Sequence, residues 1–153
     1  MNEVAVTALL CTLLSGGETE TRQYFPNIGE PRHVRIDCET PTHVIEVGLD
    51  NTASVRDSLH QALFGAELTG KIPMVIVIDT DGVEDRYQYE TRIVTRKAGV
   101  AYGVCSRDFV QRWVATSPYR ALGTDKSLND LPVDATARRH CDLGQGFDVP
   151  SLN

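Results

Sequence analysis

A strand, a helix and a second strand follow one another between residues 43 and 79, and this succession constrains the fold more than any other feature. Residues 43–49 alternate between two faces, as a strand does. Residues 54–69 carry apolar side chains at helical spacing and end at Gly70, a natural helix stop. Residues 74–78 form a short apolar run typical of a buried central strand. Such a connection is almost always a right-handed parallel crossover, so the sequence predicts an α/β fold.

The remaining segments complete a mixed sheet flanked by helices. Residues 3–14 predict an apolar helix, and residues 18–49 predict a three-stranded antiparallel meander. The whole order, α-β-β-β-α-β-α-β-α, describes a three-layer α/β/α sandwich with a mixed central sheet. We expect one domain over residues 1–117 and a loop-rich tail over 118–153 that packs on the domain or on a partner subunit. The later predicted elements are a helix over 83–97, a strand over 100–105, a helix over 108–115 and one helical turn near 135–140.

Charge and cysteine content limit the classes of partner. The chain of 153 residues has a formal net charge of -6, which argues against a binder held to nucleic acid mainly by electrostatics. The apolar run from Val4 to Leu14 is too short to cross a bilayer and has no basic segment before it, so no membrane partner is expected. The four cysteines, Cys11, Cys38, Cys105 and Cys141, lack metal-type spacing, and we interpret them as buried thiols in a reducing cytoplasm.

Two carboxylates are expected to meet on the hairpin formed by residues 33–49. If its turn is centred near Pro41, opposite residues have numbers that sum to about 83, so Asp37 faces Glu46 and Arg35 faces Gly48. Two carboxylates at that separation repel unless a proton, a cation or a basic side chain intervenes. A hard divalent ion such as Mg²⁺ is one solution. The alternative is a solvated hairpin in which Arg35 neutralises one acid.

The pattern of Asp37, then Glu46-Val47-Gly48, then Gln61 on a helix resembles the PD-(D/E)XK nuclease superfamily, which has the restriction-endonuclease-like fold. The family's core order, α-β-β-β-α-β, is similar to the order predicted for residues 1–105. The resemblance implies that Asp37 and Glu46 bind Mg²⁺ and that the Val47 carbonyl completes the metal shell. It also implies that Gln61 orients metal-bound water or a substrate phosphate.

Gly48 is where the chain departs from the family, which has at this position a Lys that polarises the attacking water. Arg35 is a substitute cation that stabilises developing charge, although an always-protonated Arg cannot act as a base. Glu3 is the candidate for the acid that some members carry on the first helix. The resemblance therefore implies either a Mg²⁺-dependent phosphodiesterase acting on nucleic acid or a catalytically inactive member. The inactive member would be a dimeric binding or assembly module.

A small polar strip runs along the helix predicted over residues 54–69. Ser54, Ser58, Gln61 and Gly65 fall together at helical spacing, which suits either the lining of a site or close packing of helix on sheet. His60 lies on the polar face of this helix and is expected to be solvent-exposed.

A second resemblance concerns the sequence MVIVIDTDG at residues 74–82. An apolar strand ending in Asp-x-Asp-Gly is similar to the nucleophile motif of haloacid-dehalogenase-like phosphatases. This resemblance implies that Asp79 attacks phosphorus, that Asp81 acts as acid and base, and that both bind Mg²⁺, with Lys97 as the candidate for the family's Lys. The alternative is a turn after a central strand, where Asp and Gly are favoured.

Overall fold

The structure, a computed structural model, describes residues 2–14, 17–121 and 140–144. A six-stranded sheet in the order β1-β2-β3-β4-β5-β6 forms its centre. The predicted α/β class is confirmed, and so is the predicted order of elements through the fourth helix. The elements are α1 (Glu3–Leu13), β1 (Glu18–Asn27), β2 (Glu30–Glu39), β3 (His43–Leu49), α2 (Val55–Thr69), β4 (Ile72–Asp79), α3 (Arg86–Ala98), β5 (Ala101–Ser106), α4 (Arg107–Ala121) and β6 (Cys141–Asp142).

The sheet is mixed. Strands β1, β2 and β3 pair antiparallel, β3, β4 and β5 pair parallel, and β6 is antiparallel to β5. The parallel pairing of β3 with β4 through α2 confirms the predicted crossover. Helix α2 ends at Gly70, whose φ of 72° lies in the left-handed region that glycine adopts without steric penalty.

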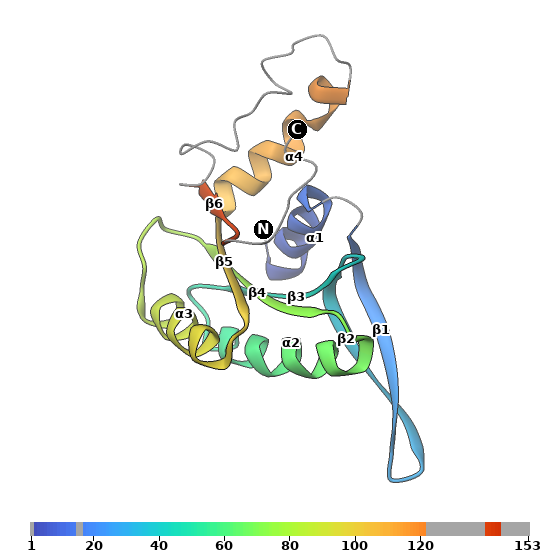
Figure 1. The fold of residues 1–153 in the computed structure, drawn as a ribbon. Helices are drawn as coiled ribbons and strands as arrows, with labels where there is room; N and C mark the ends of the chain where they lie inside the picture. Colours follow the sequence, from blue (N-terminus) through green and yellow to red (C-terminus); the bar gives the residue numbers. More distant parts are fainter. Residues whose placement is uncertain (1, 15–16, 122–139, 145–153) are drawn as a thin grey trace.

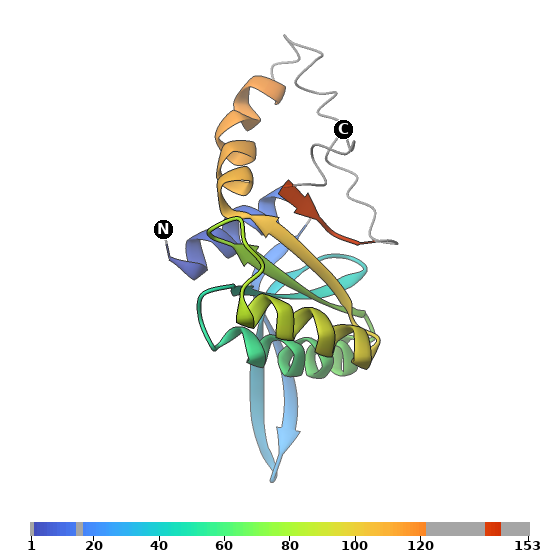
Figure 2. The same cartoon turned by 90° about the vertical axis from the view of Figure 1, so that its left-hand side faces the viewer.

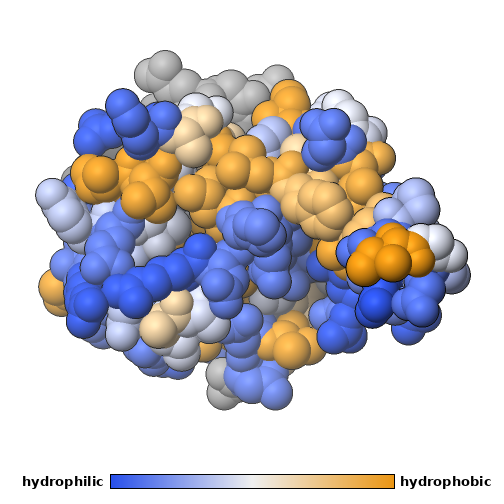
Figure 3. Space-filling view, turned by 90° about the horizontal axis from the view of Figure 1, so that it is seen from below, coloured by the Kyte–Doolittle hydropathy of each residue, from blue (hydrophilic) through white to orange (hydrophobic). Residues whose placement is uncertain are grey.

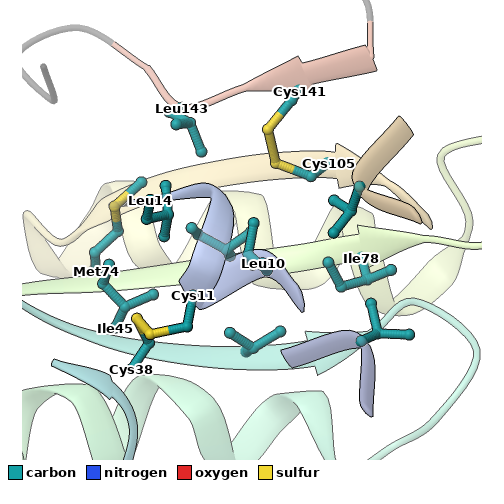
Figure 4. Packing of buried hydrophobic residues seen from close by; sticks show 14 of the residues in the cluster. Leu10, Cys11, Leu14, Cys38, Ile45, Met74, Ile78, Cys105, Cys141 and Leu143 are labelled. Atoms are coloured by element: carbon teal, nitrogen blue, oxygen red, sulfur yellow. A yellow bond between two sulfur atoms is a disulfide. The ribbon is translucent and has the colours of Figure 1, made fainter. Parts of the chain in front are cut away.

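Helices cover both faces of the sheet. Helices α1 and α4 lie on one face, and α2 and α3 lie on the other (Figures 1 and 2). The larger core fills the space between the sheet and the two helices α1 and α4, and includes Leu10, Ile45, Met74 and Ile78 (Figure 4). On the other face, Ala62 of α2 packs with Val75 and Val100. The two cores therefore enclose β3 and β4 at the centre of the sheet, where Glu46 lies.

The four cysteines form two disulfides, so the prediction of free thiols is wrong. Cys11 of α1 is bonded to Cys38 of β2, and Cys105 of β5 is bonded to Cys141 of β6 (Figure 4). The partners are 27 and 36 residues apart in sequence, and the folded sheet brings them together. Because disulfides persist mainly in oxidising compartments, this pairing weighs against the predicted cytoplasmic location, which stays a prediction. Among the described helices, none has the length and apolar character needed to cross a bilayer.

Several boundaries differ from the predicted ones. The β1–β2 hairpin extends to Asn27 and Glu30, so its second strand begins before the expected residue 33, because a tight turn at residues 28–29 joins the strands directly. Helix α4 was expected to end at residue 115, yet it continues through Pro118 to Ala121. The short strand β6 was not predicted. Apart from His140, the helical turn expected near 135–140 lies outside the described residues, as does most of the tail over 118–153, so the division of the chain stays a prediction.

Candidate metal centre

Strands β2 and β3 separate at Asp37. Cys38 pairs with Ile45 and Glu39 with Val44, so these pairs sum to 83 as predicted. Asp37, the next residue outward, does not continue the backbone ladder. Its Oδ2 instead accepts a hydrogen bond of 2.9 Å from the Val47 backbone N–H. A carboxylate therefore replaces the neighbouring strand as the partner of β3.

The separation of the strands changes the direction of the β2 side chains. Cys38 is bonded to Cys11 of α1 on one face of the sheet. Ile36 lies against α2 on the other face, where its Cδ1 would be 3.5 Å from a Cβ placed on Gly65. Regular alternation over residues 33–38 would place Val34, Ile36 and Cys38 on one face, and this expectation is wrong for Ile36 and Cys38. The alternation changes at Asp37, which has no register partner in either neighbouring strand.

Glu46 is buried in the centre of β3. Its side chain is 2% exposed, and its Oε1 is a buried oxygen without a hydrogen-bond partner among the described residues. Burial, followed by the charge of Asp37, raises the pKa of Glu46 to about 9. Glu46 is therefore protonated near neutral pH and shares a hydrogen bond with the Asp37 carboxylate.

Asp37 is the other member of this pair and is also largely buried. Its burial raises the pKa of its carboxyl group, while the hydrogen bonds from Val47 and Glu46 act in the opposite direction. The hydrogen bond from the Val47 N–H also shows where the Val47 carbonyl, a predicted metal ligand, points. Within a strand the N–H and C=O of one residue point toward the same neighbour. Since the Val47 N–H reaches Asp37, its carbonyl also faces the side on which β2 has separated.

Asp37 and Glu46 line a cavity of about 570 Å³. Two elements, β2 and α2, supply most of its wall, and single residues of α1, β1 and β3 complete it. Arg35 lies at the rim and forms an ion pair of 3.2 Å with Glu20. The lining residues are Val4, Glu20, Val34, Arg35, Ile36, Asp37, Glu46, His60, Gln61 and Phe64.

Helix α2 presents both Gln61 and His60 to this cavity. The predicted exposure of His60 is confirmed, and this exposed side chain also lines the cavity. Of the proposed polar strip, only Gln61 lines the cavity. Ser58 is buried, and Gly65 allows close packing, since a Cβ there would lie 2.9 Å from Val44.

Glu3 lies near Asp37 although it does not line the cavity. Burial raises the pKa of Glu3, and the charge of Asp37 raises it further. The neighbouring residue Val4 does line the cavity. The first helix therefore brings a third carboxylate close to the Asp37–Glu46 pair.

The space next to Gly48 is filled by α2. A Cβ on Gly48 would lie 2.5 Å from Cγ2 of Val55 and 3.0 Å from its Cα. The prediction that Arg35 faces Gly48 is therefore wrong. Arg35 instead stands opposite Arg22 of β1, and its guanidinium pairs with Glu20.

A second acidic group lies where β3 and β4 end. Single carboxylate oxygens of Asp50, Asp81 and Asp85 lie within 4.8 Å of one another. Asp79, the nucleophile of the phosphatase interpretation, accepts hydrogen bonds from the backbone N–H groups of Asp81 and Gly82 at 3.0 and 2.7 Å. This geometry is that of a turn held by an aspartate, the alternative considered for this sequence.

The described residues thus define an α/β protein with a buried, coupled carboxylate pair beside a cavity. No family model, curated protein or solved structure matches the chain.

Proposed function

We propose that this chain is a Mg²⁺-dependent phosphodiester hydrolase of the PD-(D/E)XK type, with a restriction-endonuclease-like fold and nucleic acid as its substrate. The buried, unpartnered Oε1 of Glu46 beside Asp37 carries this proposal. A buried polar atom without a partner is destabilising, so its presence calls for a ligand that supplies the missing interaction. A divalent cation supplies it for both carboxylates at once.

The donor set suits a hard cation. Asp37, Glu46 and the Val47 carbonyl offer oxygen ligands, the type that Mg²⁺ prefers. When bound there, Mg²⁺ lowers the pKa of a coordinated water and neutralises charge on a phosphoryl group. Glu46 must lose its proton to act as a ligand, so cation binding and proton release are linked at this side chain.

Other residues of the cavity suit a phosphodiester. The Gln61 amide presents a donor and an acceptor that orient water or a phosphate oxygen. Arg35 at the rim stabilises negative charge that develops on phosphorus. The order of α1 through β4 and the nearness of Glu3 to Asp37 also agree with the proposed family.

One observation favours a second candidate, a non-catalytic binding or assembly module of the same fold that acts as a homodimer. Val55 occupies the space in which a Lys at position 48 would have to begin. The cavity therefore lacks the family's usual activating ammonium. Under this candidate the carboxylate pair still binds a cation but cleaves nothing.

Cleavage of labelled single-stranded and duplex oligonucleotides, with Mg²⁺ or Mn²⁺ against EDTA, tests the proposed function. We expect metal-dependent cleavage that is lost in Asp37→Asn and Glu46→Gln. Asp85→Asn, a matched change in the other acidic group, should cleave as the unsubstituted protein does. Metal binding without cleavage would contradict hydrolysis and favour the second candidate. Cleavage that only an Asp79 substitution abolishes would favour the phosphatase-type interpretation.

A further inference from the structure

The outer face of the β1–β2 hairpin is exposed along its length. Beyond Asp37 the hairpin forms an arm, residues 21–36, that extends past α2 (Figures 1 and 2). One face of the arm packs on α2, where Phe25 meets Phe64 edge-on with ring centroids 5.0 Å apart. The other face, called here the outer face, is solvent-exposed. It consists of Arg22, Tyr24, Pro26, Pro31, His33 and Arg35.

Two arginines stand opposite each other on the outer face. Arg22 of β1 and Arg35 of β2 are register partners. Like charges at directly opposed positions destabilise a strand pair. Arg35 is partly compensated by Glu20, whereas Arg22 forms no ion pair with any residue that the structure describes. A bound anion between the two guanidinium groups would remove this repulsion.

An exposed pair of rings forms the next row of the arm. Tyr24 and His33 are register partners with ring centroids 5.5 Å apart. The Tyr24 side chain is 65% exposed. Exposed rings beside arginines suit a nucleic-acid strand, because any unpaired base can stack on a ring while its phosphates meet the guanidinium groups. Bases in a duplex are already stacked on each other and cannot use such a platform.

The register pairs Tyr24–His33 and Arg22–Arg35 form successive rows along the arm toward the Asp37–Glu46 pair. Rows on the same face of a strand are about 7 Å apart. The Arg22–Arg35 row therefore follows the level of Asp37 directly, and the Tyr24–His33 row lies about 14 Å away. Arg35 itself lines the cavity together with Asp37. A strand lying along the outer face would thus arrive at the proposed metal centre.

We propose that the outer face binds a single-stranded stretch of nucleic acid, with Arg22 and Arg35 on its phosphates and Tyr24 and His33 stacked on a base. This inference rests on the proposed function and identifies its substrate as single-stranded. Figure 3, which views the molecule from below, shows hydrophilic side chains gathered around an apolar group at the right, where the arm points toward the viewer. Ile28, at the tip of the arm, is 94% exposed.

Fluorescence anisotropy with the full-length chain in EDTA tests this inference without cleavage. The probes are labelled oligothymidylate, oligouridylate and a duplex of equal length, each over a series of salt concentrations. Arg22→Ala should weaken single-strand binding about 5-fold or more and reduce the salt slope by about 0.7. Tyr24→Ala should weaken it about 5-fold or more through lost stacking. Neither residue lines the cavity.

Matched controls are Arg96→Ala and Tyr89→Ala, which remove exposed side chains of the same kind from α3. They should bind as the unsubstituted protein does. No single-strand binding at low salt, tighter binding of the duplex, or equal losses in arm and control variants would each overturn the inference. Arm-dependent binding without metal-dependent cleavage would uphold the inference and contradict the proposed function. Metal-dependent cleavage together with normal binding by the arm variants would contradict the inference and uphold the proposed function.

Discussion

The protein has two groups of acidic side chains that are held in opposite ways. At the end of β3, Asp50 is fully buried, and its two oxygens accept hydrogen bonds from the Thr80 N–H and hydroxyl at 3.1 and 2.6 Å. Its neighbours Asp81 and Asp85 accept from the backbone N–H groups of Val83 and Gln88. In the middle of β3, Glu46 leaves one buried oxygen without such a partner.

The carboxylates of Asp50, Asp81 and Asp85, called here the Asp50 group, stabilise the local fold. The Asp37–Glu46 pair differs because one of its buried oxygens has no partner among the described residues. Every member of the Asp50 group satisfies backbone donors, so proximity of carboxylates there follows from turn and helix capping. The Asp37–Glu46 pair satisfies only the Val47 N–H and holds a proton that a free carboxyl would release at neutral pH. Residues kept against stability in this way are typical of functional sites.

The largest expected difference between the two groups is in metal affinity. Asp37→Asn should weaken Mg²⁺ or Mn²⁺ binding at least about 100-fold, because even partners outside the metal shell alter affinity about 10- to 100-fold. The Asn side chain can still accept from the Val47 N–H, so the fold should persist. Isothermal titration calorimetry measures the change. Asp85→Asn is the control, and a loss of binding in that variant alone would assign the metal to the Asp50 group.

The second difference is in stability, and its sign is unusual. Glu46→Gln should stabilise the protein on the order of 2–3 kcal/mol at pH 7, because the folded chain no longer has to keep a carboxyl protonated above its ordinary pKa. The Gln amide can donate to Asp37 as the protonated Glu46 does. Denaturant unfolding at pH 7 measures the gain, and a destabilised variant would contradict the buried, protonated state.

The pH dependence of that gain follows from the raised pKa of Glu46. In the unfolded chain its carboxyl ionises near 4.5, whereas in the folded chain it ionises near a pKa of about 9. Between these values the folded state binds the extra proton, so stability falls as pH rises. The difference between Glu46→Gln and the unsubstituted protein should therefore grow from about pH 5 to about pH 9 and then level off.

The third expected difference is a loss of stability on substitution of Asp50, smaller than the gain expected for Glu46→Gln. Asp50→Ala should destabilise the protein by about 1–3 kcal/mol, because it leaves the Thr80 N–H without its acceptor. Asp50 is also buried, which raises the pKa of its carboxyl, yet both of its oxygens have donors. Denaturant unfolding alongside Glu46→Gln makes the contrast direct. Equal signs for the two substitutions would mean that the two acidic groups do not differ as described.

The order of elements and the hairpin register were accessible from sequence because both depend on local patterns. The register set by a short turn was enough to predict that Asp37 and Glu46 lie together. The direction of Ile36, the filling of the space at Gly48 by Val55, and the pairing of cysteines far apart in sequence depend on how helices pack on the sheet. No spacing in one sequence encodes those contacts. The unpartnered oxygen of Glu46 likewise becomes visible only when its surroundings are known.

Proton release on metal binding tests the central claim most directly. Calorimetric Mg²⁺ titrations at pH 7 in buffers of different ionisation enthalpy count the protons exchanged. We expect release of about one proton per bound ion, since Glu46 must give up the proton that it shares with Asp37. Binding with no proton release, or release that persists in Glu46→Gln, would show that the cation does not displace that proton and would contradict the account.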